Sequence, residues 1–146
     1  MRLIDSHCHL DAPEFDGDRD AVVARAASAG IVAQVIPAVS ATTFPALAAL
    51  CRDRGDLFAA YGLHPMYLDQ HADSDIDTVR AALAQERAIA VGECGLDFFV
   101  AGLDPERQRA LFDAQLRLAR DFDLPLILHA RRAVDEVILR LRRIGG

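Results

Sequence analysis

The sequence predicts an α/β fold in which five parallel strands alternate with five helices, the arrangement of a partial TIM (β/α)8 barrel. Three observations support this prediction. Short apolar runs of strand length alternate with longer amphipathic stretches through all 146 residues. These runs are too apolar for a sheet with one face in water, so helices must cover both faces. A complete barrel needs about 250 residues, and we therefore expect residues 1–146 to form a single incomplete domain.

The strands are recognised by their β-branched and aliphatic side chains and by the turn residues that end them. The β-branched run at 31–37 is the clearest. The third strand closes at residues 62–65, where Gly62 and Pro65 favour a turn. Strands are expected at residues 2–6, 31–37, 57–63, 88–93 and 126–129.

Each predicted strand is followed by a helix with its own start and stop signals. Asp16 or Asp18 caps the first helix, and Gly30 ends it. Asp104 and Pro105 open the fourth and longest helix. The strict alternation of strand and helix implies a parallel sheet. Helices are expected at residues 18–29, 43–54, 75–85, 105–120 and 133–142.

The charge pattern excludes several classes of function. The net charge is −6, and all sixteen basic residues are arginine. Without lysine the chain has no Schiff-base lysine, no carbamylated lysine between metals and no Walker A lysine. An acidic protein does not hold nucleic acid by bulk electrostatics. A nuclease remains possible, because bound divalent cations reverse the field at their site.

The N-terminal segment and the apolar runs predict a cytoplasmic location. Asp5 comes before an apolar stretch of signal-peptide length has formed. The longest apolar run, residues 31–41, is interrupted by Gln34, Pro37 and Ser40. It falls short of the roughly 18 residues that a membrane helix needs.

Two histidines near the N-terminus are the first candidate metal ligands. Because side chains alternate along a strand, His7 and His9 face one side while Cys8 faces the other. Two neutral imidazoles on one face can bind a metal ion. A histidine-rich turn without metal is the alternative. The alternation also turns Cys94 away from its neighbour Glu93, so thiolate ligands are not expected.

Further imidazoles and one carboxylate stand at the ends of later predicted strands. His64 ends the third strand, Glu93 the fourth and His129 the fifth. In a parallel barrel these ends converge on one mouth, where active sites of this architecture lie. A carboxylate among histidines can bridge two divalent ions about 3.5–4 Å apart, which activate a water and bind a phosphoryl oxygen.

Four sequence motifs together resemble those of the TatD-like metal-dependent deoxyribonucleases of the amidohydrolase superfamily. They occur in the family's order and at the spacing of barrel units, and the resemblance extends over the whole chain. It covers the first five of the family's eight barrel units. The motifs are LIDSHCHLD at residues 3–11, GLHP at 62–65, GECGLD at 92–97 and PLILHAR at 125–131.

The resemblance implies a metal-binding role for each matching residue. His7 and His9 would bind the first metal, and His129 the second. Glu93 would bridge both metals and be the catalytic carboxylate. The cofactors would be two divalent ions, Mg²⁺, Mn²⁺ or Zn²⁺, and the substrate would be DNA.

Three further residues are expected near the substrate. Arg131 is similar to the family's arginine beside the substrate phosphate, which a guanidinium can contact through two hydrogen bonds. Otherwise it is a surface charge at a helix start. His64 is expected at the rim of the site, assisting substrate binding, unless it only forms a turn with Pro65. Asp97 matches the family's Gly-Leu-Asp motif and would orient a metal ligand, or else shape a loop. His71, in a polar loop, is expected to be solvated.

The sequence also departs from the family pattern. Later strands of the family supply another histidine to the second metal and an aspartate to the first, and neither has a match here. We therefore expect weak metal binding, above all at the second site, and little turnover from this chain alone.

The leading hypothesis is a metal-dependent hydrolase that cleaves DNA phosphodiesters with a water activated by two metals. One alternative is a non-catalytic fragment that binds metal weakly or self-associates through the open edges of its sheet. Another is a different amidohydrolase chemistry, such as deamination or amide hydrolysis, because the fold does not fix the substrate.

Overall fold

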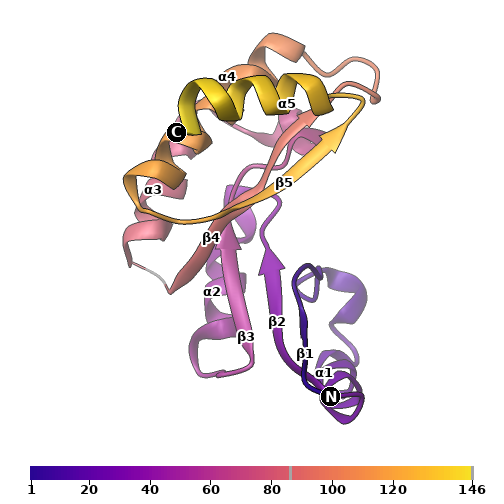
Figure 1. Ribbon diagram of the computed structural model, residues 1–146. Coiled ribbons are helices and arrows are strands. Elements are labelled where there is room, and N and C mark those ends of the chain that lie inside the picture. Colours follow the sequence, from indigo (N-terminus) through magenta and orange to yellow (C-terminus); the bar gives the residue numbers. More distant parts are fainter. Residues whose placement is uncertain (86, 146) are drawn as a thin grey trace.

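The computed structural model describes residues 1–85 and 87–145. Its five strands form one sheet in the order β1-β2-β3-β4-β5, and each neighbouring pair is parallel. The sheet is an open half-barrel in which the strands follow one another in chain order (Figure 1). The predicted partial (β/α)8 architecture is therefore confirmed.

The strands end close to their predicted ends, with one exception. β4 continues past Glu93 to Asp97. Its register with β5 shifts between Val91 and Cys94, so the glycines of this segment mark an irregularity inside the strand and do not end it. The strands are β1 (Leu3–Asp5), β2 (Ile31–Pro37), β3 (Leu57–Tyr61), β4 (Ala88–Asp97) and β5 (Leu126–Arg131).

Five α-helices connect the strands and cover the sheet. Asp104 caps α4 as predicted, because its carboxylate accepts hydrogen bonds from the backbone N–H groups of Glu106 and Arg107. Gly30, with a φ of 96°, follows the end of α1. The α-helices are α1 (Arg19–Ser28), α2 (Phe44–Arg52), α3 (Asp75–Gln85), α4 (Pro105–Asp121) and α5 (Val134–Arg140). Short helical turns are η1 (Pro13–Phe15), η2 (Ala41–Thr43), η3 (Pro65–Gln70) and η4 (Leu141–Gly145).

Two groups of buried apolar side chains fix the helices against the strands. The larger includes Ile36 of β2, Leu47 of α2 and Tyr61 of β3. The smaller joins β4, α4 and α5 and includes Cys94 and Leu116. Burial of each such aliphatic side chain contributes roughly 1.5–3 kcal/mol. The packing therefore holds the strands in place, and with them the residues at their carboxyl ends.

The outer edges of the sheet carry exposed apolar side chains. Among the described residues β1 pairs only with β2, and β5 only with β4. Ile4 on β1 is 66% exposed, and Leu128 on β5 is 37% exposed. Self-association through these edges stays a prediction. In the described part of the chain, no helix combines the length and the apolar character that crossing a membrane requires.

Candidate functional site

The carboxylate of Glu93 lies at the centre of the predicted site. Its Oε2 atom is 3.0 Å from His7 Nε2 and 3.6 Å from His9 Nε2. Its Oε1 atom is 3.4 Å from both His64 Nε2 and His129 Nδ1. Each oxygen of one buried carboxylate thus faces two imidazoles. The convergence of strand ends at one mouth, predicted from the sequence, is what the structure shows.

His7 and His9 follow β1 and direct their rings to the same side. Their Nε2 atoms are 3.3 Å apart, and the rings meet edge to face at 78°. Cys8, between them, faces the other way, with its Sγ atom 3.6 Å from the backbone oxygen of Val35. This is the alternation expected of extended backbone.

Nitrogen and oxygen atoms converge in two groups suited to divalent cations. One consists of His7, His9 and Glu93, and the other of His64, Glu93 and His129. Within each group the ligand atoms lie within 4.8 Å of one another. Imidazole nitrogen with carboxylate oxygen is a donor set that suits zinc and manganese. The side chains present therefore fit the metals that the sequence predicts.

His64 and His129 differ in which ring nitrogen has a lone pair available to a metal. His129 Nε2 lies 2.8 Å from Asp97 Oδ2, so this nitrogen carries a proton. When the ring is protonated, Nδ1 also donates, to Glu93 Oε1 at 3.4 Å; when the ring is neutral, Nδ1 is the nitrogen that has a free lone pair. His64 Nδ1 accepts the N–H of Met66 at 3.1 Å, which places the ring proton of neutral His64 on Nε2. Neutral His129 thus has Nδ1 free to bind a metal, whereas neutral His64 has its proton on Nε2 and donates a hydrogen bond to Glu93.

Electrostatics keep the central carboxyl ionised. Burial alone would raise the pKa of Glu93, but hydrogen bonds from His129 and His64, with the nearby imidazole charges, outweigh it and hold the pKa well below its usual range. The hydrogen bond to Glu93 is the main reason that the pKa of His129 is raised, against the opposing effect of burial. A carboxylate that is charged at neutral pH is what a cation needs.

Asp97 connects His129, a candidate metal ligand, with the turn that follows β4. Its Oδ2 atom accepts a hydrogen bond from His129 Nε2–H, as expected of a residue that would orient a ligand. Its Oδ1 atom accepts the backbone N–H groups of Phe99 at 2.9 Å and Val100 at 3.0 Å. The carboxylate is fully buried. It therefore both orients His129 and shapes the turn, so the two interpretations weighed for Asp97 are compatible.

Two buried glutamines of α4 support this end of the sheet, and sequence reasoning missed both. Gln108 accepts the N–H of Asp97 at 2.7 Å and donates to its carbonyl at 2.9 Å. Gln115 makes the corresponding pair with Leu63, the residue before His64, at 2.7 and 3.3 Å. The sequence does contain a signal for them, because the two glutamines stand two turns apart on the otherwise apolar face of α4.

Arg131 and Arg132 lie at the end of β5 against an aromatic ring. The guanidinium carbon of Arg131 is 3.7 Å from the centre of the Phe99 ring, and that of Arg132 is 4.5 Å away. Both side chains are exposed. Arg131 pairs with Asp97 in the register of β4 and β5, which places it beside the site. Its contact with substrate stays a prediction.

His71 is buried, so the expectation that it is solvated is wrong. It is 4% exposed, and its Nε2 atom lies 2.9 Å from the carbonyl oxygen of His64. Burial is the main reason that the pKa of His71 is lowered, which favours the neutral ring. The polar loop composition was misleading because η3 folds back and brings this ring under His64.

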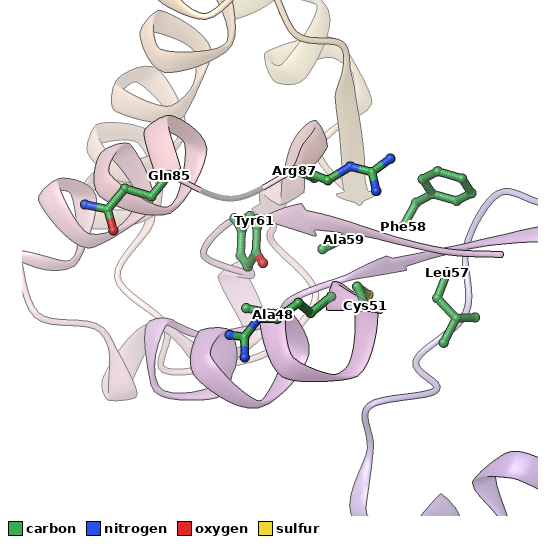
Figure 2. A pocket seen from close by; sticks show the side chains of 9 residues that line it. Ala48, Cys51, Leu57, Phe58, Ala59, Tyr61, Gln85 and Arg87 are labelled. Carbon is green, nitrogen blue, oxygen red and sulfur yellow. The ribbon is translucent and has the colours of Figure 1, made fainter. Parts of the chain in front are cut away.

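Two cavities differ in their relation to the histidines. A cavity of about 450 Å³ includes His9 and His64 in its wall and extends from the metal groups over the loops after β1, β2 and β3. A smaller one of about 110 Å³ lies between α2 and β3 (Figure 2). It is lined by apolar groups around Tyr61, with Gln85 and Arg87 at its edge, and none of the metal-site side chains reaches it. Of these two cavities, the larger one is lined by residues of the two candidate metal groups.

Comparison with known proteins agrees with this geometry. The family model described as TatD related DNase matches residues 4–145. The chain is 46% identical over 146 residues to "Uncharacterized metal-dependent hydrolase YjjV" of Escherichia coli K12, covering 97% of this chain and 56% of that protein. It is 33% identical over 141 residues to "3'-5' ssDNA/RNA exonuclease TatD" of Erwinia tasmaniensis, covering 96% and 54%.

Solved structures show the same fold. The crystal structure of the TatD homologue YjjV from Escherichia coli superposes with a TM-score of 0.93 at 44% identity, covering 97% of this chain and 56% of that one. A TatD family hydrolase from Entamoeba histolytica superposes with a TM-score of 0.85 at 19% identity, which shows the fold alone. The chain thus spans about half the length of the relatives that it matches.

Proposed function

Because the chain belongs to the family of TatD-related DNases, we propose that it supplies the metal-binding part of a hydrolase that cleaves phosphodiester bonds in DNA. The observation that carries the proposal is the position of Glu93. One ionised carboxylate presents Oε2 to His7 and His9 and Oε1 to His129. A shared carboxylate between two sets of imidazoles is the arrangement that a two-metal hydrolase needs.

In this proposal the two metal positions differ in their affinity for an ion. His7, His9 and Glu93 Oε2 would hold the first ion, and Glu93 Oε1 with His129 Nδ1 the second. Divalent ions held there would lower the pKa of water and stabilise the charge of a phosphoryl oxygen. Because neutral His64 donates to Glu93 and offers no lone pair there, the second position has two protein ligands among the described residues against three for the first, and we expect it to bind its ion more weakly.

The remaining side chains act on the ligands and on the substrate. Asp97 keeps the proton of His129 on Nε2, so that Nδ1 stays available. His64 donates to Glu93 and lies at the border between the metal groups and the larger cavity, which suits a residue that contacts substrate. Arg131, beside Asp97, would contact a phosphate oxygen.

Metal titration and a nuclease assay test the proposal together. We expect calorimetry with Mn²⁺ to show one stronger and one weaker binding event. End-labelled single-stranded DNA should be cut slowly in the presence of Mn²⁺ and not after chelation. No Mn²⁺ binding would contradict the proposed site. Binding without any cleavage of DNA would favour the non-catalytic metal-binding fragment.

Replacing Asp97 by Asn should separate ligand orientation from folding. Asn keeps an oxygen that can accept the N–H groups of Phe99 and Val100, but its amide nitrogen cannot accept the proton of His129. We expect the fold to persist and the affinity for the second Mn²⁺ to fall about 10–100-fold. Calorimetry measures the affinity, and urea unfolding followed by circular dichroism measures the stability.

Asp97→Ala is the matched comparison for this prediction. It removes both sets of hydrogen bonds, so both stability and affinity should fall. If Asp97→Asn bound Mn²⁺ as tightly as the unmodified chain, the orienting role of Asp97 would have to be abandoned.

A further inference from the structure

We infer that the cavity of about 450 Å³ beside the metal centre takes the terminal nucleoside of a nucleic-acid strand, while the sugar-phosphate chain continues over Arg131 and Arg132. The inference rests on the proposed function and names how its substrate lies. It depends on three properties of the cavity: its position, its charge and its aromatic wall.

The cavity is continuous with the candidate metal centre. His9 belongs to one metal group and His64 to the other, and both line the cavity. Its volume falls within the range of about 300–1,000 Å³ that is usual for small-molecule sites. A phosphate at the metal centre would therefore have its attached nucleoside within the space that the cavity offers.

The charge of the lining favours a neutral polar group over a phosphate. Asp11 and Glu14 contribute carboxylates, and no arginine lines the cavity. Ser40, Thr42 and Thr43 also line the cavity, and the hydroxyls of Ser40 and Thr42 are 2.7 Å apart. Carboxylates repel a phosphate but accept hydrogen bonds from sugar hydroxyls and base amino groups. The lining thus matches a nucleoside.

One wall of the cavity offers an exposed aromatic ring. Tyr67, in η3, is 39% exposed, and Met66 beside it is 45% exposed. The Tyr67 ring meets the His64 ring edge to face at 5.7 Å and 82°, so it lies beside a residue of the candidate metal centre. Stacking of bases on aromatic side chains is the usual way in which proteins bind single strands without reading their sequence.

The opposite side of the metal centre has the complementary charge. The cavity spans the loops after β1, β2 and β3, whereas Arg131 and Arg132 follow β5. Within residues 1–85 and 87–145 neither guanidinium forms an ion pair, and both lie over the Phe99 ring. The Asp97 carboxylate accepts hydrogen bonds from the backbone N–H of Phe99 and from His129. The Phe99 residue, over whose ring the two guanidiniums lie, is therefore linked to His129. Unpaired guanidiniums are suited to phosphate oxygens.

The test compares two ligands that differ only in the base. With Mg²⁺ at saturation, thymidine 5′-monophosphate should bind about tenfold or more tightly than 2-deoxyribose 5-phosphate, because only the former can stack. Tyr67→Ala should abolish this preference, and Tyr67→Phe should retain it. Arg132→Gln should leave the affinities of both ligands unchanged, since their single phosphate lies at the metal centre, and should weaken the binding of a 5′-phosphorylated thymidine dinucleotide, whose second phosphate would lie over the arginines. Calorimetric titration of the whole chain measures these affinities.

Several outcomes would overturn the inference. Equal affinity for the two ligands, an unchanged preference in Tyr67→Ala, or no binding of thymidine 5′-monophosphate at saturating Mg²⁺ would each do so. Mn²⁺ titration of the same samples separates the two proposals. If metal binds normally and the preference is missing, only the nucleoside site is wrong; if metal does not bind, the proposed function fails as well.

Discussion

Glu93→Gln should abolish measurable binding at the second metal position and weaken the first by more than about 100-fold. This loss exceeds the roughly 10–100-fold effect of an outer hydrogen-bond partner, because Glu93 lies between both groups and supplies their only carboxylate charge within the described residues. Metal-dependent cleavage of DNA should fall below detection. Calorimetry with Mn²⁺ and the nuclease assay measure the two effects.

Glu106→Gln is the matched control for this substitution. Glu106 is an exposed carboxylate in the first turn of α4 and pairs with Arg109 on the surface. The same chemical change there should leave Mn²⁺ affinity unaltered. If Glu93→Gln cut DNA at the rate of the unmodified chain, Glu93 would not be at the reacting centre and the assignment of the site would be wrong.

Gly95→Ala should destabilise the fold by more than about 4 kcal/mol, a large part of the stability of an ordinary domain. A Cβ atom at this position would lie 2.0 Å from the backbone oxygen of His129, and the φ of 143° is one that residues with side chains rarely adopt. Neither the clash with backbone nor the strain can be relieved by a rotamer change. The chain has no tryptophan, so urea unfolding is best followed by far-ultraviolet circular dichroism.

Gly55→Ala provides the comparison for the glycine prediction. A Cβ atom at Gly55 would meet nothing within 4 Å, and that loop position should accept alanine with little change in the free energy of unfolding. Equal stability of Gly95→Ala and Gly55→Ala would show that β4 and β5 can separate at His129 without cost, contrary to the close packing described above.

Most of the architecture could be predicted because each element has local signals. Residues 75–85 were predicted as a helix and form α3 with the same bounds. β4 was predicted to end at Glu93, because glycines such as Gly95 often interrupt a strand. Here they allow close approach instead: a Cβ at Gly92 would lie 2.6 Å from the oxygen of Ile127 on β5. The need for glycine at these positions becomes visible only when β5 is seen beside β4 in the structure.

The convergence of these side chains could be predicted from the sequence, but their hydrogen bonding could not. Strand ends placed His7, His9, Glu93 and His129 at one mouth, and their atoms do converge there. Which ring nitrogen carries a proton depends on the hydrogen-bond partner. For His129 the partner is Asp97, which is distant in the sequence, and for His64 it is the backbone N–H of Met66 in a local turn. The distinction between His129 and neutral His64 therefore required the structure, and their roles toward metal and substrate stay predictions.

The glutamine pairs of α4 have a consequence for how motions of the protein would be detected. The amide hydrogens of Leu63 and Asp97 are held by side chains of a helix and not by a neighbouring strand. Their exchange with solvent deuterium would report whether α4 is seated on the sheet, independently of whether the strands remain paired. Since these two residues adjoin His64 and His129 in the site, the docking of one distant helix governs how rigidly two imidazoles are held.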